Sequence, residues 1–326
     1  MNLRRRPFIA AGGIALFALS WIARSQPTGR VWRIGVLQQD GPQEWQARLV
    51  RALRALGYEE ARNIAFDYKL ALGAPGRLDA LAAELVAARV DLIVTALTPE
   101  ALAAKRATAT IPIVMQYATE PVELGLVASL ARPGGNVTGT TTNSPALAGK
   151  MIQVLRDALP GLRQLTTLAD PSYPGMRWYL GYAERACAAL GIQMTTLPVS
   201  TTRDLDAAFA AMERVRPGAV FLTMTGAILI GIERIIAFAE RLRIPALYAV
   251  KFPVQMGGLM SYSADFEAMA KRNAWMIDRI FKGARPADIP VEEPALFSFV
   301  VNLRTARAMG LTIPSAVLLR ADEVIQ

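Results

Sequence analysis

The sequence contains no histidine and one cysteine among its 326 residues. Without histidine the chain cannot carry an imidazole acid or base, a histidine-bound metal or a Ser-His-Asp triad. The lone Cys187 cannot form an intramolecular disulfide, and it lies in a run with helical character, Tyr182–Leu190, where we expect a small buried apolar residue. We therefore predict no metal site and no cofactor.

Charged residues are also scarce, at 19% of the chain against 53% hydrophobic residues. This balance excludes disordered and coiled-coil chains, and the length favours two lobes around large buried cores. The net charge is +9, but residues 1–25 hold four arginines and no acid, which leaves 32 basic against 27 acidic residues. Because these do not gather in a stripe with interleaved aromatics, we expect no nucleic-acid partner.

The motifs of enzymes built on α/β folds are missing as well. No G-x-G-x-x-G follows the first strand, and neither G-x-x-x-x-G-K-[ST] nor G-x-S-x-G occurs. The adjacent pair Glu292-Glu293 lies in a proline-bounded loop instead of across a cleft. We therefore predict a protein that is not an enzyme.

Residues 1–25 have the composition of an export signal. Three arginines, Arg4-Arg5-Arg6, precede an apolar stretch from Phe8 to Ala23, which is shorter than the ~20 residues that span a bilayer. Ala23-Arg24-Ser25 places small residues at a signal-peptidase site and predicts a mature chain that begins at Gln26. General and twin-arginine export both fit, and an uncleaved anchor is the alternative to cleavage. In each case we expect a periplasmic protein.

Strand-like and helix-like runs alternate through the first half of the remaining chain. The strands are rich in Val, Ile and Leu, which indicates a parallel sheet covered by helices on both faces. Expected strands are Arg33–Gln38, Ile64–Lys69, Asp91–Ala96 and Pro112–Ala118, and expected helices are Glu44–Gly57, Arg77–Ala88 and Glu100–Ala107.

The same order then repeats in the second half. Leu56-Gly57 is echoed by Leu190-Gly191, and Ile111-Pro112 by Ile244-Pro245, at offsets of 134 and 133 residues. Asp79 is echoed by Asp206 at an offset of 127 residues. Offsets this similar predict two similar doubly wound lobes, with chance pairing of common dipeptides as the alternative. A further strand is expected at Ala219–Met224.

Glycine-rich stretches mark the expected crossovers between lobes. One is Arg132–Gly139, and a second is Gly257–Tyr262; their Gly-Gly pairs fit hinges or plain turns equally well. A long helix at Phe266–Lys282, a strand at Phe297–Asn302 and a short helix near Arg304–Gly310 follow. Lobe I is predicted to comprise residues 31–140 plus 258–290, and lobe II residues 141–257 plus 291–326.

Several segments resemble a known family, the bacterial ABC transporter substrate-binding proteins that include tryptophan- and phenylalanine-binding members. Together these segments extend over essentially all of the chain after its first thirty residues. They are VWRIGVL (31–37), ALGYEEARNIAFDY (55–68), TPEALAAKRATATIPIV (98–114), GLVASLARPGGNVTG (125–139), GGLMSY (257–262), GARPADIPVEEP (283–294) and NLRTARAMGLTIPSAVLLRADEVI (302–325).

The resemblance implies a type I periplasmic-binding fold, in which two doubly wound α/β lobes are joined by a three-strand hinge. Its ligand would lie between the lobes at the carboxyl ends of the strands, which is where open parallel sheets bind ligands. The resemblance predicts the fold, and it does not identify the substrate.

Polar residues that follow the expected strands are the candidate ligand-binding residues of lobe I. Thr98 would cap a helix whose first residue is Pro99, and the free N–H groups there would bind a ligand carboxylate unless the cap is an ordinary one. Glu120 departs from the Asp-Pro pair frequent in the family, and it would meet a ligand ammonium. The lobe I candidates are Gln38, Gln39, Asp40, Thr98, Pro99, Tyr117, Thr119, Glu120 and Thr140.

Equivalent positions supply the candidates of lobe II. Asp170 is the strongest, as a partner for the positive end of a ligand, with a helix cap as the alternative. The apolar run Ala227–Ile230 departs from a family that more often has polar residues there, and Tyr117, Tyr173 and Tyr248 would form an aromatic pocket with few charges. The candidates of lobe II and the second crossover are Asp170, Ser172, Tyr173, Thr223, Thr225, Tyr248 and Ser261.

These features predict an extracytoplasmic solute-binding receptor of an ABC importer. Its ligand would be a small molecule of aromatic or amino-acid-like character, and its partner an ABC permease in the inner membrane. We expect a monomer. The alternative is a sensory ectodomain of the same fold that reports the ligand to a membrane signalling protein.

Overall fold

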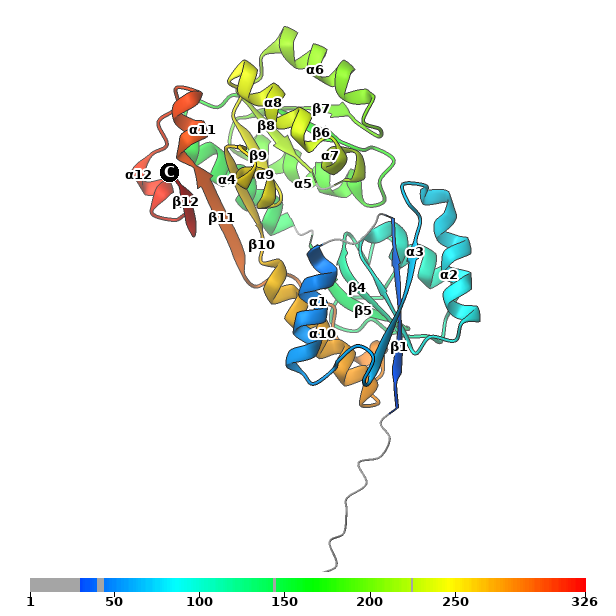
Figure 1. The fold of residues 1–326 in the computed structure, drawn as a ribbon. Helices are drawn as coiled ribbons and strands as arrows, with labels where there is room; N and C mark the ends of the chain where they lie inside the picture. The colour runs from blue at the N-terminus through cyan, green and yellow to red at the C-terminus, as the bar shows by residue number, and fades with distance from the viewer. Residues whose placement is uncertain (1–29, 40–43, 143–144, 224) are drawn as a thin grey trace, which may run out of the picture. The chain divides into compact units, whose positions relative to one another are not determined.

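The structure is a computed structural model, and it describes residues 30–39, 44–142, 145–223 and 225–326. The export signal expected over residues 1–25 and the candidate Asp40 lie outside these ranges. From Val31 onward the chain forms one compact unit, in which helices alternate with the strands of two sheets (Figure 1). Within the described ranges no helix is both long and apolar enough to cross a membrane.

The first sheet contains five parallel strands in the order β2-β1-β3-β4-β5. The strands β3, β4 and β5 are buried along their whole length. The continuous apolar runs of β3 and β4 predict this for a sheet covered on both faces. Strand β5 has no such run, and it contains residues 137–139 of the expected first crossover, which are paired with β4 in the first sheet instead. The elements of this region are β1 (Trp32–Gln38), α1 (Glu44–Ala55), β2 (Ile64–Leu70), the 3-10 helix η1 (Pro75–Arg77), α2 (Leu78–Ala87), β3 (Leu92–Thr95), α3 (Thr98–Ala107), β4 (Ile113–Ala118) and β5 (Val137–Thr141).

The second sheet contains seven strands in the order β12-β11-β10-β9-β8-β6-β7. Its part β7-β6-β8-β9-β10 is parallel and repeats the order of the first sheet, in agreement with the repeat in the sequence. Its first elements are α4 (Pro145–Ala158), β6 (Gln164–Ala169), α5 (Met176–Ala189), β7 (Gln193–Pro198), α6 (Asp204–Val215), β8 (Ala219–Leu222), α7 (Gly226–Ile230), α8 (Ile232–Leu242), β9 (Ala246–Tyr248), α9 (Phe252–Gln255) and β10 (Met260–Ala264).

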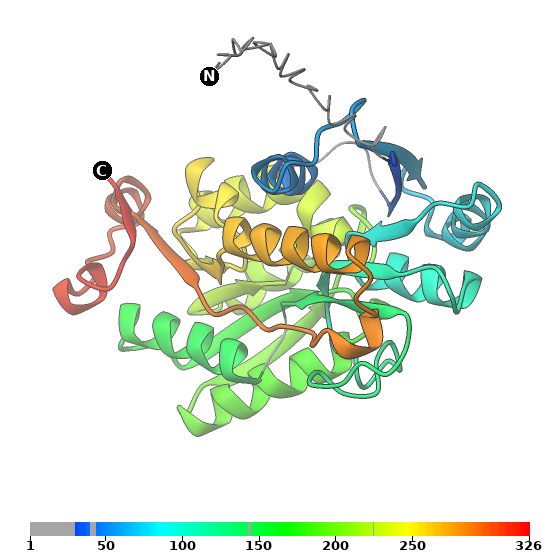
Figure 2. The same ribbon diagram turned by 90° about the horizontal axis from the view of Figure 1, so that it is seen from below.

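The C-terminal part of the chain contributes to both sheets. Helix α10 packs against α1, β4 and β5 of the first sheet, and α1 and α10 lie side by side in Figures 1 and 2. Strand β11 is antiparallel to β10 and pairs in parallel with β12. These elements are α10 (Phe266–Phe281), the 3-10 helix η2 (Pro286–Asp288), β11 (Phe297–Asn302), α11 (Leu303–Ala308), α12 (Ser315–Leu318) and β12 (Glu323–Ile325).

The chain passes between the two sheets after β5, between β10 and α10, and between η2 and β11. The first and third passes run together, since the Thr141 amide donates to the Glu292 carbonyl at 3.0 Å. At the second and third passes the Asp265 amide donates to the Leu296 carbonyl at 2.9 Å. These backbone bonds join three connections into a hinge, as the resemblance implied.

The second pass lies later than expected. Residues 258–264 were predicted to open lobe I, but β10 is hydrogen-bonded to β9 and β11 in the second sheet. The pair Gly257-Gly258 is a turn within lobe II instead of a hinge. Gly257 has a φ of +113°, and a Cβ on Gly258 would lie 2.5 Å from Cε2 of Tyr248. The other lobe boundaries remain predictions.

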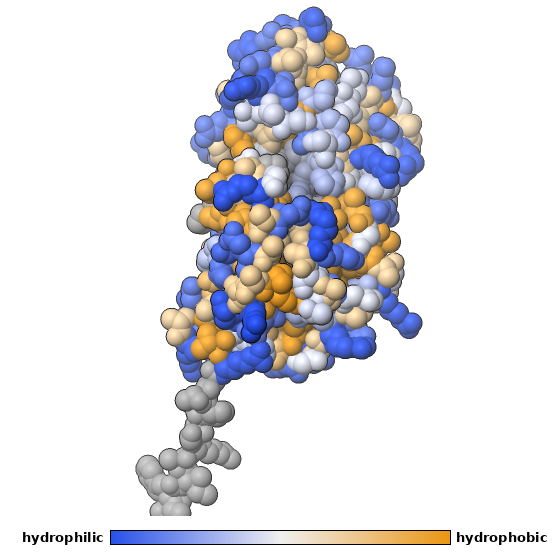
Figure 3. Space-filling view, turned by 90° about the vertical axis from the view of Figure 1, so that its right-hand side faces the viewer, coloured by the Kyte–Doolittle hydropathy of each residue, from blue (hydrophilic) through white to orange (hydrophobic). Residues whose placement is uncertain are grey.

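The outer surface follows from the one-sided burial of the helices. The face in Figure 3 carries mostly hydrophilic residues with small groups of hydrophobic ones between them. This mixture is usual for helices that bury one side against a sheet. Cys187 lies on the buried side of α5 with 1% of its surface exposed, as expected.

Candidate functional site

A cavity lies where strands of both sheets end. Leu97 follows β3 and Tyr117 lies near the end of β4 in the first sheet, and Tyr173 and Thr223 follow β6 and β8 in the second. We call it the inner cavity; it is lined by Leu97, Tyr117, Thr119, Thr142, Leu147, Met151, Tyr173, Met176, Tyr179, Thr223, Ala249, Tyr262, Ser263, Ala264 and Phe266.

The inner cavity is aromatic and uncharged. Five of its lining residues carry aromatic rings, and its polar groups are hydroxyls. No aspartate, glutamate, lysine or arginine is among the described residues that line it. A ligand group inserted here would meet rings, methionines and hydrogen-bonding hydroxyls instead of ions.

A wider cleft, which we call the mouth, adjoins the inner cavity. The two share Leu97, Tyr117, Ser263, Ala264 and Phe266, so they form one continuous site. Unlike the inner cavity, the mouth is lined by charged side chains: Glu44, Arg48, Lys251, Asp265 and Glu267.

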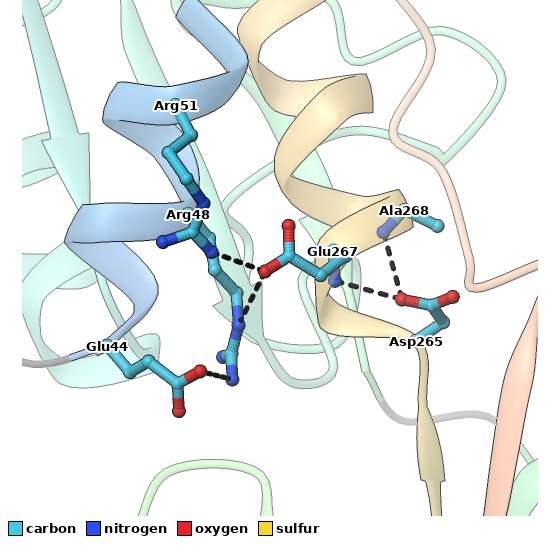
Figure 4. Close-up of polar contacts among 6 residues, drawn as sticks. All are labelled: Glu44, Arg48, Arg51, Asp265, Glu267 and Ala268. Atoms are coloured by element: carbon cyan, nitrogen blue, oxygen red, sulfur yellow. Dashed lines mark hydrogen bonds and ion pairs between the residues drawn. The ribbon is translucent and has the colours of Figure 1, made fainter.

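Arg48 is the least exposed of the paired cations at the mouth. Its terminal Nη2 lies 2.6 Å from Glu44 and its Nε 3.4 Å from Glu267, and 19% of its side chain is exposed. Figure 4 shows Arg48 and Arg51 reaching from α1 to Glu267 at the start of α10. Asp265 caps that helix by accepting bonds from the amides of residues 267 and 268. The mouth is therefore built where α1 meets the N-terminus of α10.

The Tyr117 side chain lies between the two compartments. Its ring meets that of Phe266 edge-on at 4.9 Å, and no described residue accepts a hydrogen bond from its buried hydroxyl. Burial raises the pKa of Tyr117 to about 12, and the charge of Arg48 and its hydrogen bonding to the hydroxyl oxygen partly oppose the rise. At neutral pH the hydroxyl is thus an uncharged donor without an acceptor.

Thr98 does not cap its helix, contrary to expectation. Leu97 is the N-cap of α3, Thr98 is its first residue, and Pro99 follows as the second. The Thr98 hydroxyl accepts a bond from the Thr119 amide at 2.8 Å and pairs with the Thr119 hydroxyl at 3.0 Å. It is occupied in joining the ends of β3 and β4, which explains why it leaves the cap position.

Tyr173 reaches this region from the second lobe. Burial raises the pKa of its hydroxyl, the charge of Glu100 adds to the rise, and hydrogen bonding with Thr98 opposes it. Its placement in the inner cavity agrees with the expected aromatic pocket.

Glu120 lies at a direct contact between the lobes, beside the inner cavity and not among its lining residues. The Tyr182 hydroxyl donates to its Oε2 at 3.0 Å, and the neighbouring Thr119 hydroxyl donates to the Pro174 carbonyl at 3.3 Å. A Cβ on Gly175 would lie 2.7 Å from the Thr119 hydroxyl. We call this contact the seam; it consists of Thr119, Glu120, Pro174, Gly175 and Tyr182.

The Glu120 carboxyl is strongly perturbed at the seam. Only 4% of the residue is exposed. Burial raises the pKa of Glu120 to about 7; the Tyr182 hydrogen bond opposes this rise, and the charges of Glu123 and Glu293 add to it. The expected role of Glu120 toward a ligand ammonium stays a prediction, and its contact with the other lobe is the role that the geometry provides.

Asp170 organises its own loop. Its Oδ1 accepts from the Ser172 amide at 2.9 Å, the Ser172 hydroxyl at 2.7 Å and the Ser200 hydroxyl at 2.6 Å. Neither Asp170 nor Ser172 lines the inner cavity or the mouth. The N-cap of α5 is Gly175, so Asp170 does not cap that helix either.

Tyr248 was expected in the aromatic pocket and lies elsewhere. It ends β9 in the core of lobe II, 1% exposed, with its ring against Gly258. Tyr179, Tyr262 and Phe266 supply the remaining rings of the inner cavity. Of the three tyrosines expected in the aromatic pocket, Tyr117 and Tyr173 line the inner cavity.

Ser261 is also buried away from the site, and Ser263 lines it. Ser261 pairs with Tyr248 at the end of β9, while β10 continues beyond that end with only β11 beside it. Ser263 therefore borders both compartments.

The other candidates divide between the site and the cores. Thr119 and Thr223 line the inner cavity, and Thr223 donates to the Leu168 carbonyl at 3.1 Å. Gln39 borders the mouth, where its amide donates to Glu100 at 3.0 Å. Three candidates are buried outside both compartments: Gln38 beneath α1, Thr140 against Gln116 and Asn273, and Thr225 before α7.

Residues from helices complete the inner cavity and were not among the candidates. Leu147 and Met151 lie one turn apart on α4, and Met176 and Tyr179 lie at the start of α5. The signal that would have found them is position, because each helix begins directly after a strand that ends at the site.

Comparison with known proteins places this architecture. A family model described as ABC transporter substrate binding protein matches residues 34–325. A tyrosine-binding protein of Clostridioides difficile (strain R20291) is 24% identical over 267 residues, which cover 82% of this chain and 76% of that protein.

Two solved structures are similar along their entire length. A conserved domain protein from Vibrio cholerae has a TM-score of 0.85 at 28% identity, and an ABC domain from Streptococcus pneumonia in complex with L-Trp has 0.84 at 26%. Each match covers 90% of this chain and 100% of the other. The chain therefore belongs to the family of ABC transporter substrate-binding proteins, which are ligand receptors and not enzymes.

Proposed function

We propose that this protein is the extracytoplasmic receptor of an ABC importer and that it binds an aromatic amino acid between its lobes. The observation that carries the proposal is the inner cavity, to which both lobes contribute; the described residues that line it supply rings and hydroxyls and no charged side chain. A receptor of this type releases its ligand to a permease in the inner membrane. We propose that it acts as a monomer in the periplasm.

The lining favours an aromatic ligand on physical grounds. Rings of Tyr173, Tyr179 and Phe266 offer edge-on and stacked contacts, which favour aromatic groups beyond the area that they bury. Hydroxyls of Thr119, Thr142 and Thr223 would bind a phenol or an indole N–H. The tyrosine-binding relative and the L-Trp complex of another similar chain support the same ligand class.

Closure around the ligand follows from the split of the lining between lobes. Because each lobe supplies part of the contacts, the assembled site is complete only when both lobes meet the ligand. Binding then stabilises the folded chain by roughly 2.7 kcal/mol at a hundredfold excess of ligand over its dissociation constant.

The test is to identify what the native protein carries. Protein purified from the periplasm is heat-denatured, and the released small molecules are identified by mass spectrometry; calorimetry with L-Trp, L-Tyr and L-Phe follows. We expect an aromatic amino acid, recovered unchanged, and a raised melting temperature. Release of a sugar or an inorganic ion, with no heat from the three amino acids, would reject the ligand class.

Export and partner are tested separately. N-terminal sequencing of the periplasmic protein is expected to begin at Gln26, and recovery of only the intact Met1 form in the membrane would indicate an anchor. Uptake of the labelled ligand by vesicles that contain the cognate permease should require the receptor. Uptake that is equal without it would contradict the importer role.

A further inference from the structure

The boundary between the inner cavity and the mouth contains two hydrogen-bond donors that face the same space. Phe266 defines this boundary, since its ring centroid is 4.9 Å from that of Tyr117 and 5.8 Å from Cζ of Arg48. Both side chains therefore lie against one ring, Tyr117 on the side of the inner cavity and Arg48 on the side of the mouth.

The Tyr117 hydroxyl is a buried donor that the folded chain leaves without an acceptor. The residue is 5% exposed, and no described residue accepts a hydrogen bond from its hydroxyl. Such a group costs free energy when it is buried unbonded, and in native proteins it usually has a partner. Its position at the wall of the site points to an acceptor on the ligand.

Arg48 supplies the second donor and the positive charge. Its Nη2 lies 2.6 Å from Glu44 and its Nε 3.4 Å from Glu267, and the guanidinium also lies within hydrogen-bonding reach of the Tyr117 hydroxyl. An ordinary surface ion pair would be as exposed as that of Arg51, whose side chain is 56% exposed; the Arg48 side chain is 19% exposed against Phe266. Burial beside the site distinguishes Arg48 from its neighbour on the same helix.

We propose that Arg48 and Tyr117 bind the carboxylate of an aromatic amino acid whose ring lies in the inner cavity. A guanidinium N–H and a phenol O–H both donate, and a carboxylate is the ligand group that accepts two charge-assisted bonds at once. Glu44 and Glu267 flank Arg48 and meet the ammonium of the same ligand. The inference rests on the proposed function and assigns the anion to the mouth, not to the start of α3.

The proposal predicts selectivity that depends on the carboxylate. L-Trp should bind to the unmodified protein much more tightly than tryptamine, which lacks the carboxylate, and more tightly than indole-3-propionate, which lacks the ammonium. A missing charge-assisted bond typically corresponds to about ten- to hundredfold in affinity.

The variants Tyr117→Phe and Arg48→Gln test the two donors by calorimetry with the same three probes. We expect L-Trp binding to weaken about tenfold in Tyr117→Phe and about a hundredfold in Arg48→Gln. Tryptamine binding should stay within about twofold in Tyr117→Phe, because that donor does not meet it, and it should not weaken in Arg48→Gln, because Glu44 and Glu267 then remain for its ammonium. Arg48→Lys keeps the positive charge and loses the planar pair of guanidinium N–H donors. Its affinity for L-Trp should lie between those of the unmodified protein and Arg48→Gln.

Matched controls separate affinity from folding. Tyr58→Phe removes a hydroxyl of the same lobe that bonds to Asp278 outside the site, and Arg106→Gln removes an exposed ion pair with Asp79. Both should leave all three affinities unchanged. Ligand-free melting temperatures of every variant are measured beside the affinities.

The outcomes distinguish this inference from the proposed function. Unchanged L-Trp affinity in Tyr117→Phe and Arg48→Gln overturns the proposed carboxylate contact and leaves an aromatic amino acid as the ligand class. Parallel loss of L-Trp and tryptamine also overturns it, since a general loss is structural. The unmodified protein could also bind indole-3-propionate through both donors and bind none of the amino acids. In that case the carboxylate contact is supported and the proposed ligand class is rejected. Binding of no carboxylate probe rejects both.

Discussion

The inner cavity and the mouth are adjacent and share five residues, yet their chemistry differs. The inner cavity is lined by rings and hydroxyls, and those charged side chains that border the site within the described ranges lie at the mouth. The difference has an energetic reason. Burying an unpaired charge in an enclosed space costs roughly several kcal/mol, and keeping a paired charge near water costs far less. Ligand shape is therefore recognised inside, and ligand charge where the site opens.

The largest effect should come from filling the inner cavity. Ala249 follows β9 and lines the cavity, so Ala249→Phe places a phenyl ring in the space for the ligand. We expect L-Trp affinity to fall at least about a hundredfold, or roughly 2.8 kcal/mol, measured by calorimetry. Ala249→Ser, which hardly changes the volume, is the control. Full affinity in Ala249→Phe would mean that the ligand occupies the mouth alone.

A smaller loss is expected when the lobes are kept apart at the seam. Gly175 has a φ of +88°, and a Cβ there would meet the Thr119 hydroxyl at 2.7 Å and Cγ of Glu120 at 3.2 Å. Gly175→Ala should weaken binding about tenfold, because a ligand held by both lobes requires them to meet. Gly191→Ala carries similar backbone strain with nothing within 4 Å, so equal losses in both variants would point to strain instead of separation.

The seam should also make stability depend on pH. The pKa of Glu120 is raised to about 7 in the folded chain from 4.5, so the folded state binds more protons than the unfolded state between these values. Stability is then highest below about pH 4.5 and falls as the pH rises through 7, by on the order of 1–2 kcal/mol after allowance for solvent screening.

Denaturant unfolding at pH 5 and pH 8 measures this slope. Glu120→Gln should remove it and stabilise the protein at pH 8, while the exposed Glu240→Gln should keep the slope of the unmodified chain. An identical slope in both variants would assign the pH dependence to other groups.

The smallest effect on affinity is expected from a charged residue of the mouth that is not placed to contact the ligand. Lys251 borders the mouth and pairs with Glu323, and about two fifths of each side chain is exposed. Lys251→Gln should change L-Trp affinity by less than about threefold and stability by less than about 1 kcal/mol, at low and at high salt. A tenfold loss of affinity would show that the mouth attracts the ligand through its overall charge instead of through Arg48.

The predicted elements and the observed ones agree closely, and the candidate site agrees in part. Buried strands such as Asp91–Ala96 were identified from continuous apolar runs, because burial of a parallel sheet on both faces leaves that pattern. Tyr248 and Ser261 were expected to line the site but are buried outside both compartments, because a position at the end of a strand does not reveal which elements cover the side chain. Ser263 shows the converse, since β10 outruns its neighbour there.

The sequence by itself determined the two-lobed α/β architecture, and the resemblance of its segments indicated the family. The architecture follows from periodic burial, which is local in the chain. Only the tertiary structure decided that Arg48, Tyr117 and Phe266 meet at one boundary. They lie on α1, β4 and α10, and α10 joins the first lobe only after the chain has completed most of the second. Contacts over such separations depend on packing that no local pattern encodes.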